Sequence, residues 1–171
     1  MRRSKEMPTA PTSDRAVELA RRFHAANGDV IAFAQGLTDD DWTLHCEREG
    51  RSVGQVVEHI AAGHLIIGGI VEAMALGLPL PVAARRTEVT GARYNARQAA
   101  LFADRSRRDG LRSLRRNGGV VGRFLASLTD EQLDRAIGTT EGPITTQDEI
   151  EGGLIGHALR HLEAVRETVA R

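Results

Sequence analysis

Gly156-His157-Ala158-Leu159-Arg160-His161 lies near the C-terminal end of the 171-residue chain, where apolar residues recur at helical spacing. Two histidines four residues apart share one face of a helix. Their Cβ atoms are then roughly 5–6 Å apart, so both imidazoles can bind the same ion. A bound divalent metal usually takes three or more protein ligands, so the pair needs a third. His59 is the candidate for that third ligand.

The composition favours one domain with a single core. Apolar residues make up 41% of the chain, and 23 basic residues balance 23 acidic ones. A formal net charge of zero gives no electrostatic footprint for nucleic acid or for an anionic membrane surface, so we expect neither as a partner. The single cysteine, Cys46, excludes an internal disulfide.

The ends and the apolar runs of the chain predict a soluble, cytoplasmic protein. Residues 1–12 are polar and contain Pro8 and Pro11, so we expect a flexible leader rather than a signal peptide. A single domain is then predicted over residues 13–171. The apolar run around residues 66–80 is too short and too interrupted by glycine for a membrane span.

The first two long helices are predicted from their caps. One begins after Ser13 or Asp14 and ends near Gly36, and the next begins at the N-cap Ser52 and runs to about Leu78. The second of these is apolar over more than half of its circumference. Such breadth predicts contact with two or more neighbouring helices.

The second half of the chain predicts two more long helices. One begins at Ser106, and Gly118-Gly119 within it indicates a weak point or a tight helix contact. The last follows a predicted capping box at Thr146-Gln147-Asp148-Glu149. Residues 79–105 form a long connection, with a short helix expected around residues 95–102, that lets the second and third helices run parallel. No strand is predicted.

The other histidines and the cysteine offer alternatives to this site. His64 is the rival ligand on the second helix, but five residues separate it from His59, which places the two about 140° apart around the helix. His24 is either a contact near the site or a half-exposed helix histidine. His45 lies in a polar loop, and Cys46 has no identifiable basic neighbour that would activate its thiol.

No carboxylate is expected to project beside the histidines. Glu58 and Glu163 are adjacent to candidate ligands in the sequence, but helical geometry aims them elsewhere. We therefore predict no general base, and any catalysis would depend on the metal and a bound water or thiol.

The motifs resemble those of the DinB/YfiT-like superfamily over nearly the whole chain after the leader. That family's Trp-Ser-Val start of the second helix, with a histidine seven residues after the serine, corresponds to Arg51-Ser52-Val53 and His59. Its His-x-x-x-His-Leu motif in the fourth helix corresponds to residues 157–162. Leu128-Thr129-Asp130-Glu131-Gln132-Leu133 is similar to the family's turn after the third helix. Arg51 departs from the usual tryptophan.

The resemblance implies an all-α, up-down-down-up four-helix bundle with a long crossover between helices 2 and 3. It assigns His59, His157 and His161 as ligands of a divalent metal such as zinc, nickel or iron, and it implies a homodimer. Characterised members include transferases and isomerases that use bacillithiol, mycothiol or glutathione. Other members have lost the metal.

Three functions are compatible with these features. The first is a thiol-dependent S-transferase or isomerase, in which the open metal position binds a thiolate that attacks a small electrophile. The second is a metal-dependent hydrolase that uses metal-bound hydroxide. The third is a non-catalytic metal-binding or stress-response binding module. The two enzymes would take a small-molecule substrate.

Overall fold

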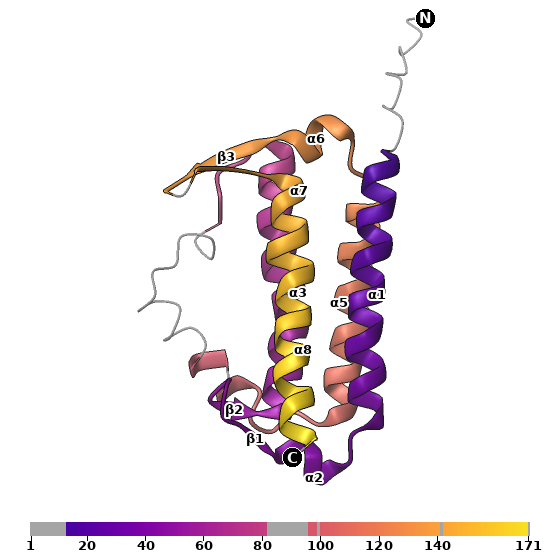
Figure 1. Ribbon diagram of the computed structural model, residues 1–171, viewed down its shortest axis with the longest axis vertical. Helices are drawn as coiled ribbons and strands as arrows, with labels where there is room; N and C mark the ends of the chain where they lie inside the picture. Colours follow the sequence, from indigo (N-terminus) through magenta and orange to yellow (C-terminus); the bar gives the residue numbers. More distant parts are fainter. Residues whose placement is uncertain (1–12, 82–95, 99, 141, 171) are drawn as a thin grey trace, which may run out of the picture.

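Figure 1 shows the computed structural model, which describes residues 13–81, 96–98, 100–140 and 142–170. Four long helices run along its longest axis. They are α1 (Asp14–Gly36), α3 (Val53–Leu76), α5 (Arg107–Leu125) and a C-terminal helix made of α7 (Thr146–Asp148), the π-helical segment η2 (Glu149–Ile155) and α8 (Gly156–Val169). α3 and α5 ascend in this view while α1 and α8 descend, so the predicted up-down-down-up bundle is confirmed.

Capping residues fix where the long helices begin and end. Ser13 and Ser52 accept hydrogen bonds from backbone N–H groups of their first turns, as predicted, and Ser106 does the same for α5. α3 ends at Gly77, which adopts the left-handed conformation with φ 65°. The predicted end at about Leu78 therefore lies slightly beyond the observed end at Leu76.

The capping box of the last helix lies one residue earlier than predicted. Thr145 and Asp148 form it, with the Thr145 hydroxyl accepting from the Asp148 backbone at 3.1 Å. Thr146 is buried, and its own hydroxyl donates to the backbone oxygen of Arg135 at 3.1 Å, so it is not available as a cap.

Two short antiparallel hairpins contradict the expectation of no strands. β1 (His45–Cys46) pairs with β2 (Arg51–Ser52), and β3 (Ala136–Thr139) pairs with β4 (Gly142–Thr145). Strands of two and four residues are too short to show a period-two pattern in the sequence. The short helices α2 (Asp39–Thr43) and α6 (Asp130–Asp134) complete the described elements, and the fold class remains all-α.

Most of the crossover and the leader cannot be compared with the predictions. Residues 1–12 and 82–95 lie outside the described residues. Residues 96–98 and 100–101 are helical, which agrees with the predicted short helix around residues 95–102.

The core consists of two apolar clusters with a polar layer between them. One cluster lies toward α6 and includes Leu133, and the other lies toward β1 and includes Cys46. Asn27 and His64 are buried between the clusters, and His64 Nε2 lies 2.9 Å from Asn27 Oδ1. A Cβ atom at Gly118 would collide with the Asn27 amide, so the glycine serves a tight contact between α1 and α5.

α3 is apolar because it is central to the bundle. Over its 24 residues it is long and apolar enough to cross a membrane, with a mean hydropathy of 1.5 in its most apolar window. The sequence-based argument that this region is too short for a span therefore does not hold. Half of that window is buried, and the helix packs against α5, η2 and α8. We therefore interpret α3 as the core helix of the bundle.

Candidate metal centre

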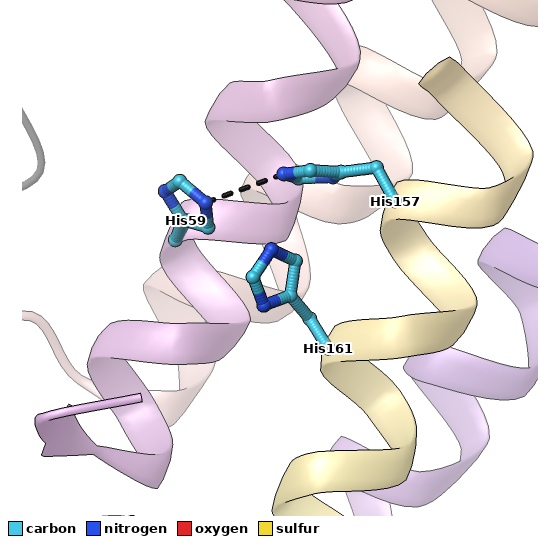
Figure 2. Close-up of side chains that lie close together, drawn as sticks. All are labelled: His59, His157 and His161. Atoms are coloured by element: carbon cyan, nitrogen blue, oxygen red, sulfur yellow. Dashed lines mark hydrogen bonds between the residues drawn. The ribbon is translucent and has the colours of Figure 1, made fainter. Parts of the chain in front are cut away.

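The three predicted histidines come together where α3 and α8 pack. His59 projects from α3, and His157 and His161 project toward it from successive turns of α8 (Figure 2). One potential ligand atom from each ring lies within 4.8 Å of the others. The Nε2 atoms of His59 and His157 are 3.2 Å apart. Neighbouring nitrogens of a tetrahedral zinc site, with Zn–N of about 2.0–2.1 Å, lie about 3.3–3.4 Å apart, so this spacing fits a shared ion.

Two oxygen atoms outside the triad orient two of the rings. His161 Nδ1 lies 2.8 Å from Glu49 Oε1, and His59 Nδ1 lies 2.7 Å from Gln98 Oε1. Carboxylate and amide oxygens only accept hydrogen bonds, so each histidine carries its proton on Nδ1. Each Nε2 is thereby left with a free lone pair. Histidines that bind metals in proteins are held in the same way.

Gly63 of α3 makes room for the third ring. A Cβ atom at this position would lie 2.5 Å from Cε1 of His157. The Nδ1 atom of His157 is buried and has no hydrogen-bond partner among the described residues. Nε2 of His59 carries no proton, so it can only accept a hydrogen bond. The hydrogen bond between the two rings therefore requires that His157 carry its proton on Nε2 and donate it to His59. A metal ion between the two Nε2 atoms would replace that proton.

The site keeps two of its three histidines neutral. Burial lowers the pKa of His59 to about 4, against the opposing effect of its bond to Gln98. Burial, together with the smaller effects of the neighbouring His161 and His59, lowers the pKa of His157 to about 2. Both rings are therefore neutral at neutral pH, which is the state a metal ligand requires. Three neutral nitrogen donors leave a divalent ion with its full charge and an open position.

Glu49 shows that the expectation of no carboxylate beside the histidines is wrong. It lies in the loop between β1 and β2, where its backbone N–H donates to Cys46 O at 3.0 Å. Arg51, which stands where the related family usually has tryptophan, donates from Nε to the Glu49 backbone oxygen at 3.2 Å. Burial acts to raise the pKa of Glu49, but the hydrogen bond from His161 and nearby positive charge outweigh it and the pKa is lowered.

Helical spacing could not have identified Glu49 or Gln98. Glu49 is brought to α8 by the hairpin, and Gln98 is brought to α3 from the crossover. The only local signal was Gly50, whose positive φ of 63° closes the turn after Glu49.

The rival histidines on α1 and α3 lie in other contacts. His64 is fully buried against Asn27, and burial lowers its pKa to about 4. His24 is an exposed residue of α1 whose ring packs against Gly122 of α5. Among the described residues neither belongs to the cluster of three.

The remaining candidates are also accounted for. His45 is exposed on β1. Cys46 is fully buried with its Sγ atom 3.6 Å from Ala164 O, so it is not positioned as a reactive thiol. Glu58 is buried and pairs with Arg105 at 2.9 Å, which agrees with the expectation that it points away from the triad.

Comparison with known proteins adds one family and one solved structure. The sequence matches the family model of the DinB superfamily over residues 22–165. The fold is similar to that of YfiT from Bacillus subtilis, described as a probable metal-dependent hydrolase with an unusual four-helix bundle topology. The two chains are 16% identical with a TM-score of 0.66, over 99% of this chain and 93% of that one. None of the curated proteins compared with the chain matches it.

Proposed function

Because the chain belongs to the DinB superfamily, we propose that it is a metal-dependent enzyme whose divalent ion is bound by His59, His157 and His161. The convergence of three ring nitrogens within 4.8 Å supports this most directly. His64 contacts Asn27 and lies outside the cluster. The rings of His59 and His161 also bond protein groups through Nδ1, but the three rings of the triad still gather around one point. The description of YfiT as a probable metal-dependent hydrolase supports the same interpretation.

The ligand set favours zinc, nickel or iron. Imidazole nitrogens suit these metals, whereas magnesium and calcium prefer oxygen ligands. Glu49 is not counted as a ligand because its carboxylate accepts the hydrogen bond from His161. Its role is to hold the proton of that ring on Nδ1, and Gln98 does the same for His59.

The reaction we favour transfers a low-molecular-weight thiol, such as mycothiol, bacillithiol or glutathione, to a small electrophile, or uses the thiol in an isomerisation. A metal bound by three neutral histidines supplies a charged open position, which favours a thiolate or a hydroxide at neutral pH. We rank the thiol reaction first because characterised members of the family that the sequence resembles include thiol-using transferases. A protein that consumes such a thiol would work in the cytoplasm, where thiols are kept reduced.

Hydrolysis is the second candidate, and the description of YfiT favours it. It requires the same three ligands, with water in place of the thiol. The two reactions therefore differ in their co-substrate rather than in the metal site.

Metal analysis of protein purified without a nickel column tests the metal site. We expect one divalent ion per chain, and we expect the His157→Ala variant to lose it. The His45→Ala variant is the control, because His45 is exposed on β1. Full retention of the metal by the His157→Ala variant would contradict the ligand assignment.

Turnover assays then separate the candidate reactions. Metal-loaded protein is incubated with monochlorobimane in the presence or absence of each thiol, and with p-nitrophenyl acetate alone. Thiol-dependent conjugation supports the transferase, and thiol-independent ester cleavage supports the hydrolase. If the native protein contains no metal and shows no turnover, the non-catalytic binding module is the remaining candidate function.

A further inference from the structure

Glu149 begins the π-helical segment η2, which directly precedes the two histidines of α8. π-helical turns are rare in proteins, and those that occur are often found at functional sites. An α-helix turns by about 100° per residue, whereas a π-helix with its i→i+5 hydrogen bonds turns by roughly 80°. In a pure α-helix Glu149 would lie about 80° around the axis from His157. The π-helical winding reduces this offset to roughly 40°, so Glu149 and His157 lie on about the same side of the helix.

The neighbours of Glu149 confirm which side of the helix it occupies. Gln147 Oε1 accepts from Arg15 of α1 at 2.7 Å, and Glu151 Oε1 accepts from Arg22 of α1 at 2.8 Å. Glu149 lies two residues from each of them and therefore on the opposite side of the helix. That side is turned away from α1 and carries His157, which packs on α3.

The side chain of Glu149 runs along the helix toward the histidines. Its carboxylate fills the space beside Gly153, where a Cβ atom would collide with it. Gly153 is one turn before His157, which corresponds to about 5.4 Å along a helix axis. A substrate bound beside the triad would therefore lie within reach of the carboxylate.

The surroundings of the Glu149 carboxylate differ from those of the carboxylates that hold other side chains in place. Buried Glu58 pairs with Arg105, and Glu49 accepts from His161. The half-buried Glu149 side chain has no hydrogen bond or ion pair among the described residues. Burial raises the pKa of this carboxyl. An unpaired, partly buried carboxyl near a metal centre is typical of a residue that accepts and returns protons.

We propose that Glu149 is the general acid–base residue of the reaction at the three-histidine site. This inference rests on the proposed function. Glu149 takes the proton of the incoming thiol S–H, and the resulting thiolate sulfur forms its bond to the electrophilic carbon. The bond from that carbon to its leaving group breaks, and Glu149 passes the same proton to a basic leaving group or, where the leaving group is a halide ion, to solvent. No oxidant or reductant is required.

A titration followed by infrared spectroscopy tests the position of Glu149 without an activity assay. The carboxyl band is assigned by its loss in the Glu149→Gln variant, and zinc content is measured in the same samples. We expect zinc to shift the titration of this band to lower pH, because a nearby cation favours the carboxylate. The Glu151→Gln variant, which changes the α1 side of the same segment, should keep both the band and the shift.

The outcomes separate this inference from the proposed function. Stoichiometric zinc with an unshifted Glu149 band overturns the inference and leaves the metal site intact. Failure of the unmodified chain to bind zinc overturns the proposed function, and the inference with it. Gly153→Ala should alter the band by displacing the carboxylate, whereas Gly152→Ala adds a Cβ atom in open space and should not.

Conjugation of glutathione with monochlorobimane provides the kinetic test. We expect Glu149→Gln to lower kcat by about 10²–10⁴-fold while KM for glutathione stays close to its original value. The decrease in kcat at acidic pH, which protonation of Glu149 would cause, should also disappear in this variant. Glu151→Gln should retain the kcat of the unmodified chain. An equal loss in both variants, or no loss in Glu149→Gln, would overturn the role of Glu149.

Discussion

Replacing Gly63 with alanine tests whether close packing of α3 against His157 builds the metal centre. The new Cβ atom would lie 2.5 Å from Cε1 of the imidazole, so the ring must move. The ring is the far end of a side chain and can move more easily than the backbone. Gly69, on the same helix, has nothing within 4 Å of its Cβ position and provides the matched control.

The expected magnitudes follow from opposing effects. Each alanine gains about 1 kcal/mol of helix propensity over glycine. At Gly63 an overpacking cost of about 1–3 kcal/mol opposes this gain. The metal-free Gly63→Ala protein should therefore unfold at a temperature equal to or below that of the unmodified chain. Gly69→Ala should unfold about 2–4 °C higher, as expected for about 1 kcal/mol in a chain of this size.

The Gly63→Ala variant should differ more from the unmodified chain in its response to zinc than in its stability without zinc. At a free concentration 100 times Kd, one bound ion stabilises the folded state by about 2.7 kcal/mol. A displaced His157 that weakens zinc binding by about 100-fold reduces this to about 0.4 kcal/mol at the same concentration. The zinc-induced rise in Tm should then fall from about 5–11 °C to about 1–2 °C.

Differential scanning fluorimetry with and without zinc, together with chelator competition, measures both quantities. Gly69→Ala should keep the full zinc response. If Gly63→Ala binds zinc as tightly as the unmodified chain and shows the same rise in Tm, His157 does not depend on this contact and the reasoning is refuted.

Three further predictions concern the outer contacts, the buried histidine and the assembly. Glu49→Ala should weaken zinc binding by about 10–100-fold in chelator competition, because His161 loses the acceptor that fixes its proton; unchanged affinity would exclude this role. Burial lowers the pKa of His64 in the folded chain to about 4, below the ordinary value of 6.5. The unfolded chain therefore binds the proton first, and the free energy of unfolding falls as pH drops from about 6.5 toward 4. Urea unfolding of the metal-free protein at several pH values should show this fall, and His64→Gln should reduce it. Light scattering at micromolar concentration should give the mass of a homodimer, since Leu65 and Leu76 of α3 remain 48% and 45% exposed; a monomer mass would contradict it.

The sequence predicted those parts of the protein that depend on local spacing. Helical periodicity and caps located the four long helices, and the four-residue step from His157 to His161 placed both rings on one face. The choice of His59 over His64 came from the family register. The structure agrees with it in bringing His59 to the pair and leaving His64 against Asn27.

The features that the sequence did not predict depend on contacts between distant segments or on backbone hydrogen bonding. Glu49 reaches His161 only through the β1–β2 hairpin, although 112 residues separate the two. The π-helical winding of η2 leaves no periodic signal in seven residues, so Glu149 could not be aligned with His157 from the sequence. The capping box was misplaced because Thr145 and Thr146 are adjacent, and only burial distinguishes them.

The polar layer of Asn27 and His64 separates the two apolar clusters in space, but the two clusters are not formed by separate stretches of the chain. Within each long helix the chain passes from one apolar cluster to the other, as between Ala26 and Val30 in α1 and between Ile155 and Ala158 at the start of α8. Regions that unfold independently are usually contiguous in sequence. Each cluster draws residues from all four long helices, so neither can unfold as a short contiguous segment. The two clusters should therefore melt together in one cooperative transition despite the polar layer between them.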